Sequence, residues 1–195
     1  MINLEGYRLF VTGAGSGIGL ATVRRASEMG AKLAGTIRGD EQRAALSAFM
    51  APEHIHDLDV TEGNALDGAI AATIESLGGL DGALACAGII SLSTSIETTD
   101  AVWDDVIGTN LTGSFNLARA AARHMKDMGK GSIVMISSQI GLVGHPRAAA
   151  YAASKAGING LARTMALELG ADNVRINAVG PGPIATDMTA ETRTI

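Results

Sequence analysis

Short apolar runs alternate along the chain with longer segments in which apolar positions recur at helical spacing. The apolar runs predict buried strands, because a strand covered on both faces of a parallel sheet is hydrophobic almost throughout. The expected strands cover residues 8–12, 32–37, 54–58, 82–87, 131–138 and 174–180. The expected helices cover residues 17–29, 40–50, 62–78, 149–170 and, as one long helix or two joined ones, 100–129. This alternation favours an α/β fold with a doubly wound parallel sheet.

The connections between these elements are too short to contain a second domain, so residues 1–195 are expected to form a single domain. Residues 183–195, PIATDMTAETRTI, are small, polar and rich in threonine, with no clear period. We expect this segment to be a mobile loop.

Composition and charge argue against several classes of protein. The chain is 47% hydrophobic but only 3% aromatic, which indicates an aliphatic core and argues against disorder. A net charge of −5 without a basic run argues against a nucleic-acid partner. No apolar run is long enough for a membrane span, residues 1–10 do not resemble a signal peptide, and Cys86 has no cysteine to pair with. We therefore expect a cytoplasmic protein.

A glycine-rich turn, VTGAGSGIGLA, joins the first expected strand to the first helix. Gly13, Gly17 and Gly19 follow a GxxxGxG spacing, and Gly15 is an additional glycine. Such glycines let backbone N–H groups at a helix N-terminus approach a pyrophosphate. The alternative is a turn that only packs the helix on the strand. With strand order 3-2-1-4-5-6, a ligand would lie between strands 1 and 4, where the small residues 85–88 leave room.

Tyr151 and Lys155 are separated by four positions in an expected helix, so they share a face. An ammonium group beside a phenol lowers the phenol pKa, which can make the tyrosine a usable acid and base near neutral pH. Ser138 ends the strand 131–138, where its hydroxyl could hold a substrate oxygen. The alternative is a half-exposed tyrosine with a solvated lysine.

These residues together resemble the short-chain dehydrogenase/reductase family. TGAGSGIG (12–19) is similar to its cofactor loop and YAASK (151–155) to its YxxxK pair. The serine thirteen residues before the tyrosine is Ser138, and Asn110 matches the asparagine of the central helix. PGPIATDM (181–188) resembles the segment beside the nicotinamide, and LDV (58–60) the turn beside the adenine.

The resemblance implies a Rossmann-like domain that binds NAD(P) and catalyses hydride transfer to or from a small ketone or secondary alcohol. By this resemblance, Tyr151 is the acid/base, and Lys155 lowers the tyrosine pKa and holds the nicotinamide ribose. Ser138 orients the reacting oxygen, and Asn110 positions a water that relays the proton. The alternative function is a truncated or degenerate nucleotide-binding module with little turnover. The family resemblance implies these cofactor-binding residues: Gly13, Gly15, Ser16, Gly17, Ile18, Gly19, Arg38, Asp59, Val60, Ala87, Gly88, Tyr151, Lys155, Pro181, Gly182, Ile184 and Thr186.

The loop between Ser138 and Tyr151 is expected to form one wall of the substrate pocket, with Gln139 and His145 in it. His145 either contacts substrate or faces solvent. In the family, helices that close over the substrate and a seventh strand follow the PG segment, and we expect neither within this chain.

Cofactor choice depends on the end of the second strand, GTIRGDE. An acidic residue there would bind the 2′-hydroxyl of NAD, but family alignment places Ile37 at that position and Arg38 next to it. An arginine can pair with the 2′-phosphate of NADP. Asp40 would repel that phosphate if it turned inward; alternatively Arg38 is solvated and Asp40 caps the next helix. NADP is favoured over NAD.

Two further features concern stability and assembly. Cys86 stands where the family often has a structural asparagine, so we expect a cost in stability and no nucleophilic role. His54 and His56 lack a third ligand nearby, so no metal site is expected. The helices at 111–127 and 150–169 correspond to a dimer interface in the family, which implies a homodimer or homotetramer. The alternative is that these helices are buried only against their own sheet.

Overall fold

The computed structural model describes residues 3–190 of the chain. Within them, parallel strands form a six-stranded sheet in the order β3-β2-β1-β4-β5-β6, which confirms the predicted topology. The strands are β1 (Arg8–Thr12), β2 (Lys32–Ile37), β3 (Ile55–Asp57), β4 (Gly82–Ala85), β5 (Gly131–Ile136) and β6 (Val174–Val179).

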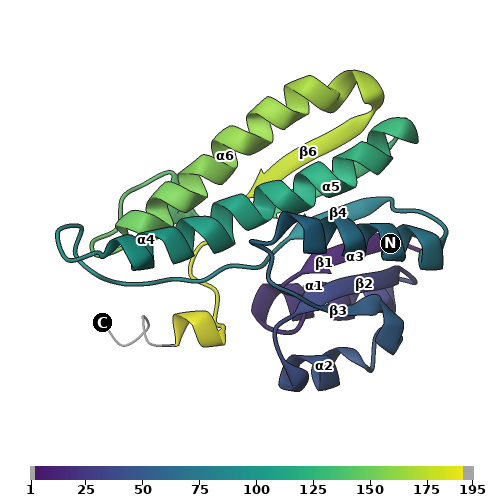
Figure 1. The fold of residues 1–195 in the computed structure, drawn as a ribbon, viewed down its shortest axis with the longest axis horizontal. Helices are drawn as coiled ribbons and strands as arrows, with labels where there is room; N and C mark the ends of the chain where they lie inside the picture. The colour runs from purple at the N-terminus through teal and green to yellow at the C-terminus, as the bar shows by residue number, and fades with distance from the viewer. Residues whose placement is uncertain (1–2, 191–195) are drawn as a thin grey trace.

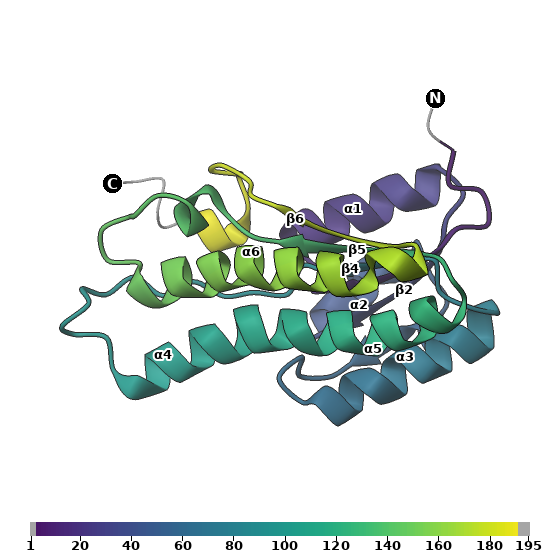
Figure 2. The same cartoon turned by 90° about the horizontal axis from the view of Figure 1, so that it is seen from above.

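Helices cover both faces of this sheet (Figures 1 and 2). The helices α1 (Gly17–Glu28) and α2 (Asp40–Leu46) pack on one face. On the other face lie α3 (Gly63–Leu77), α5 (Gly113–Asp127) and α6 (Ala149–Leu169), with α4 (Asp100–Ile107) leading into α5. None of the described helices is both long and apolar enough to cross a membrane.

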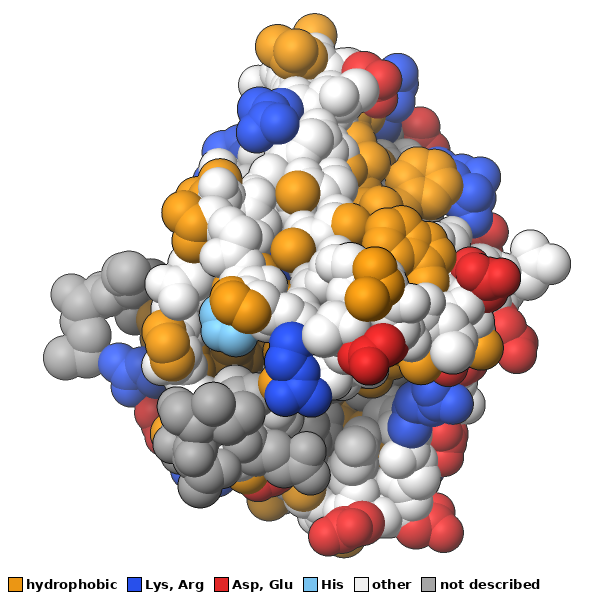
Figure 3. All heavy atoms as spheres, turned by 90° about the vertical axis from the view of Figure 1, so that its left-hand side faces the viewer, with side chains coloured by type: hydrophobic (Ala, Val, Ile, Leu, Met, Phe, Trp, Pro, Cys, Tyr) orange, Lys and Arg blue, Asp and Glu red, His pale blue; other side chains and the backbone are white. Residues whose placement is uncertain are grey.

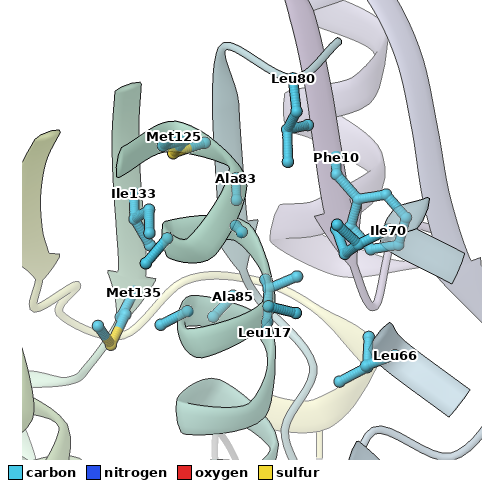
Figure 4. Packing of buried hydrophobic residues seen from close by; sticks show 14 of the residues in the cluster. Phe10, Leu66, Ile70, Leu80, Ala83, Ala85, Leu117, Met125, Ile133 and Met135 are labelled. Carbon is cyan, nitrogen blue, oxygen red and sulfur yellow. The ribbon is translucent and has the colours of Figure 1, made fainter. Parts of the chain in front are cut away.

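Successive residues of each central strand enter different cores, because side chains along a strand point alternately to the two faces. Phe10 packs with the side chains of α3 and α5, whereas its neighbour Val11 packs with those of α1 and α2. Figure 4 shows Phe10 beside Ile70 of α3, with Leu66 of the same helix and Leu117 of α5 lower in the view. Small strand residues such as Ala83 and Ala85 let α5 approach the sheet closely.

Several element boundaries differ from the sequence prediction. The helix expected over 40–50 ends at Leu46, and a short 3₁₀ turn, Pro52–His54, precedes β3. Of the two alternatives for residues 100–129, the structure shows two joined helices, and the π-helical turn at Gly108–Thr112 that joins them was not predicted. The strand expected over 131–138 ends at Ile136. The extra residue in a π-helical turn shifts the helix face, and π turns are frequent at functional sites.

The carboxyl ends of all these strands meet at one edge of the sheet, because the strands are parallel. That edge lies on the left in Figure 1, where the start of α6 and the chain after β6 also lie. The expected mobile segment 183–195 begins there and includes a short 3₁₀ turn, Asp187–Thr189. Residues 191–195 of that segment lie outside the described residues.

Candidate active site

A cavity of about 310 Å³ opens at the carboxyl edge of the sheet, where β1 and β4 are neighbours and the order of connections reverses. Figure 3 shows the molecule from this side. Most of the predicted site residues line the cavity, namely Gly13, Ser16, Gly17, Ile18, Arg38, Val60, Ala87, Gly88, Ser138, Tyr151, Lys155, Pro181, Gly182, Ile184 and Thr186. Segments distant in sequence therefore converge on one concave surface, the arrangement expected of a ligand site at a switch point.

The glycine loop has different tasks at different positions. Gly13 adopts φ 62°, and a Cβ there would lie 2.8 Å from the Ala87 Cα, so only glycine fits. A Cβ on Gly19 would overlap the Gly13 carbonyl oxygen, so Gly19 allows α1 to pack on the turn and does not line the cavity. Gly15 also lies outside the lining and backs onto the side chain of Gln42.

Cys86 lines the cavity beside the glycine loop, at the place of the family asparagine. Its backbone N–H donates to Thr12 Oγ1 at 3.1 Å, as does the N–H of Ala87 at 3.3 Å. The Thr12 hydroxyl thus ties the end of β1 to the chain after β4. Burial raises the pKa of the Cys86 thiol to about 11, which keeps it protonated and poorly nucleophilic at neutral pH.

Asn110 is fully buried in the π-helical turn and joins three segments. Its Nδ2 donates to the Ile89 carbonyl and to Ser154 Oγ, each at 3.0 Å, and its Oδ1 accepts from the Ile89 N–H at 2.8 Å. Ser154 Oγ in turn donates to the Tyr151 carbonyl at 2.7 Å. Asn110 does not line the cavity, whereas its neighbour Thr109 does. Its side chain therefore positions the surroundings of Tyr151 in this structure.

Lys155 is only 5% exposed, and its Nζ donates to the Ile136 carbonyl at 2.8 Å. Burial lowers the pKa of Lys155 to about 8, with the Cys86 thiol acting in the opposite direction. The ammonium is 5.5 Å from the centre of the Tyr151 ring. Lys155 is thus a buried base that remains largely protonated at neutral pH.

The expected lowering of the Tyr151 pKa is wrong for this structure. Burial raises the pKa of the phenol, and only a hydrogen bond with the Ser138 side chain opposes this effect. The physical reason is orientation, because Lys155 Nζ is directed to the end of β5. Ser138 lies just beyond β5, where its Oγ also accepts from the Ile140 N–H at 3.2 Å.

Arg38 follows β2 and lines the cavity, but its guanidinium pairs with a carboxylate rather than standing free. Arg38 Nη1 is 3.2 Å from Asp59 Oδ2. Hydrogen bonds from Thr61 lower the pKa of Asp59, and the Arg38 charge lowers it further. Asp59 itself is not part of the lining. Asp40 is exposed in the first turn of α2 and does not cap that helix, since Gly39 occupies the N-cap.

Residues 139–150, the loop between Ser138 and Tyr151, do not line this cavity. Gln139 and His145 are exposed and do not line the cavity, and His145 Nδ1 lies 2.7 Å from the Pro146 carbonyl. Sequence reasoning missed other residues that line it, among them Thr36, Gln42, Thr109 and Ser137. The sequence offered one signal that could have placed Gln42 at the cavity. Gln42 lies in the first turn of a helix that follows a parallel strand, and such a turn lies at the carboxyl edge of the sheet.

A family model for short chain dehydrogenases matches residues 8–194. The chain belongs to this family. It is 35% identical over 194 residues to the 3-oxoacyl-[acyl-carrier-protein] reductase FabG of Vibrio cholerae, covering 96% of this chain and 78% of the relative. It is also 35% identical over 188 residues to a 3-alpha-(or 20-beta)-hydroxysteroid dehydrogenase of Mycobacterium tuberculosis, covering 95% and 72%.

A solved structure of a putative short-chain alcohol dehydrogenase from Sinorhizobium meliloti 1021 superposes with a TM-score of 0.88 at 38% identity. The match covers 98% of this chain and 78% of that one. Family membership identifies this short-chain dehydrogenase as a nicotinamide-dependent oxidoreductase acting on the CH–OH/C=O pair.

Proposed function

We propose that this short-chain dehydrogenase interconverts a small ketone and its secondary alcohol with NADP(H), and that Tyr151 is the acid/base. The observation that carries the proposal is that Ser138, Tyr151 and Lys155 line the same cavity as the glycine loop. The glycine loop forms a wall that is suited to a dinucleotide, and Tyr151 supplies a proton donor to the same cavity. The relatives whose names specify an oxoacyl or a hydroxysteroid substrate support this carbonyl and alcohol chemistry.

The residues of the cavity fit a nicotinamide dinucleotide. Gly13 and Gly17 keep the loop free of side chains beside the N-terminus of α1, so backbone N–H groups can reach a pyrophosphate. Lys155 would hold the nicotinamide ribose, and Arg38 at the end of β2 would take the 2′-phosphate that distinguishes NADP. The bound cofactor supplies or accepts the hydride.

The chain itself orients the substrate and moves the proton. Ser138 and Tyr151 both line the cavity, and their hydroxyl groups would both face the reacting oxygen. In reduction, Tyr151 donates its proton to that oxygen, and in oxidation it removes the proton from the alcohol. The Lys155 ammonium lies 5.5 Å from the centre of the Tyr151 ring and keeps a positive charge beside the phenol. Asn110 and Ser154 keep the helix that carries this tyrosine in place.

Replacement of the tyrosine tests this assignment. Tyr151→Phe is expected to lower kcat by about 10²–10⁴, because general acid–base catalysis contributes that much. Cofactor affinity, measured by fluorescence titration, should stay nearly unchanged. Tyr7→Phe is a matched control, since Tyr7 donates to the Asp81 carbonyl away from the cavity. Full activity in Tyr151→Phe would refute the assignment, and cofactor binding without turnover on any carbonyl would indicate a degenerate module.

The preference for NADP has its own test. Values of kcat/KM for both cofactors should favour NADP(H), and Arg38→Leu should reduce kcat/KM for NADP(H) more than for NAD(H), because a lost charge pair affects only the phosphate. A preference for NADH in the unaltered protein would refute the proposed choice.

We also propose that the protein forms homodimers or homotetramers through α5 and α6. Phe115 on α5 is 38% exposed, and Arg119 Cζ lies 5.0 Å from the centre of its ring. Trp103 on α4 is 41% exposed. Figure 3 shows hydrophobic side chains gathered on the upper part of the site face, toward the side of α4 and α5. Light scattering should show dissociation on Phe115→Glu, but none on Leu142→Glu, which alters an exposed loop residue. A monomeric unaltered protein would contradict the proposal.

A further inference from the structure

The turn between β2 and α2 already satisfies the donors that a phosphate would use. Gln42 Oε1 accepts from the Arg38 N–H at 3.0 Å, and Asp57 Oδ2 accepts from the Gly39 N–H at 3.3 Å. The Arg38 guanidinium is itself paired with Asp59 at 3.2 Å. An incoming anion therefore has to replace protein acceptors rather than fill an empty cradle.

Asp59 is the acceptor that competes most directly for charge. Its Oδ1 accepts from the Thr61 N–H at 2.9 Å, which anchors the carboxylate after β3. Arg38 is the more exposed partner, with its side chain 70% exposed against 28% for Asp59. Exposed ion pairs are weak, so a phosphate dianion can displace the carboxylate from the guanidinium but still experiences its negative charge nearby.

We propose that Asp59 limits the selectivity of this site for NADP over NAD by competing with the 2′-phosphate for the Arg38 guanidinium. NAD carries a hydroxyl at that position and does not need to displace the carboxylate, so Asp59 acts against NADP alone. Asp59 is thus a specificity-determining residue that acts through Arg38. This inference rests on the proposed function, specifically on the binding of the 2′-phosphate at Arg38.

The direct test is Asp59→Asn, which keeps an oxygen that can accept from the Thr61 N–H. Titration calorimetry should give an NADP⁺ affinity about three- to fivefold higher, the change expected for one exposed charge pair. The ratio of NADP⁺ to NAD⁺ affinities should rise by the same factor, because any contact with the adenine is common to both cofactors, and this rise should shrink as salt is raised. Asp59→Ser serves as a second variant if Asp59→Asn unfolds.

Two controls separate competition at Arg38 from a general effect of charge. Asp67→Asn removes a carboxylate on α3 that pairs with Arg123 on α5. This change should leave the ratio of NADP⁺ to NAD⁺ affinities unchanged. In an Arg38→Leu background, Asp59→Asn should no longer raise that ratio, because the shared partner is gone.

The possible outcomes are distinct. An unchanged or lower ratio in Asp59→Asn, or a gain that persists without Arg38, would overturn this inference while leaving the oxidoreductase assignment intact. Failure of the unaltered protein to bind either cofactor would overturn the proposed function and this inference with it.

Discussion

Asn110 Nδ2 donates to Ser154 Oγ across 3.0 Å and thereby joins the π-helical turn to the helix that carries Tyr151. Ser154 is completely buried and passes the connection on by donating to the Tyr151 carbonyl. The amide thus bridges the chain after β4, the π-helical turn and α6, all without reaching the cavity itself. A network of this kind, centred on the buried side chains of Asn110 and Ser154, holds the position of Tyr151.

Ser154→Ala should therefore affect both stability and catalysis. The change leaves an amide proton of Asn110 unsatisfied, which is expected to cost about 1–3 kcal/mol in the free energy of unfolding. It should also lower kcat more than it raises KM for the carbonyl substrate, because Tyr151 loses its alignment. Ser154→Thr, which retains the hydroxyl, should recover kcat, and Ser47→Ala on the exposed end of α2 should have no effect. An unaltered kcat in Ser154→Ala would contradict the positioning role.

The buried Lys155 should make stability depend on pH in the alkaline range. Burial lowers its pKa to about 8, so the unfolded chain binds a proton that the folded chain lacks between pH 8 and about 10.4. Stability contributed by this group therefore rises with pH across that window, and below it the folded protein carries the full cost of a buried charge.

Lys155→Met is accordingly expected to raise the free energy of unfolding at pH 7 by about 1–3 kcal/mol while abolishing activity. The gain should disappear as pH approaches about 10.4. Denaturant unfolding at several pH values measures this difference, with Lys32→Met on the exposed start of β2 as control. A variant less stable than the unaltered protein at pH 7 would show that the buried ammonium is well compensated.

Asp81, at the opposite edge of the sheet from the cavity, should stabilise the fold at neutral pH. Its carboxylate receives Arg8 Nε at 2.6 Å and Arg8 Nη2 at 2.8 Å, and Lys130 Nζ lies 3.2 Å away. The Arg8 guanidinium holds the pKa of Asp81 well below its usual range. The stabilisation is therefore present above about pH 4 and is lost as the pH falls further.

Asp81→Asn should lower the free energy of unfolding by about 1–3 kcal/mol at pH 7, and the difference from the unaltered protein should narrow below about pH 4. Thermal unfolding between pH 7 and pH 3 provides the measurement. The matched control is Asp67→Asn, whose partner Arg123 is 64% exposed, so a change within about 0.5 kcal/mol is expected. A difference that stays constant with pH would exclude this electrostatic origin.

Glycines that look alike in the sequence should respond oppositely to alanine. Gly19→Ala brings a Cβ against the Gly13 carbonyl, so we expect a loss of more than about 2 kcal/mol and weaker cofactor binding. Gly68→Ala in α3 meets no atom within 4 Å and should stabilise the protein by about 0.5–1 kcal/mol, as expected in a helix interior. Circular dichroism melts of both variants test the contrast, and equal effects would contradict it.

Most strand and helix positions could be predicted because they depend on local patterns, and the order of strands followed from the doubly wound topology. The run at 8–12 is apolar at its three central positions, as a doubly covered strand requires, and the glycines of the loop predicted the position of the cavity. The spacing of Tyr151 and Lys155 likewise placed them on one helix that borders that cavity. The features that the sequence did not predict are confined to short segments. The end of α2 at Leu46 and the π-helical turn at Asn110 depend on packing, which outweighs helix propensity.

The sequence by itself determined which residues form strands and helices and brought Ser138 and Tyr151 to one edge of the sheet, because periodicity and parallel topology leave few alternatives. Only the tertiary structure decided which groups each side chain contacts. The direction of Lys155 Nζ toward Ile136, the pairing of Arg38 with Asp59, and the exposure of Gln139 and His145 all depend on side-chain orientation between elements. Such orientations follow from the packing of the whole domain, which no local pattern specifies.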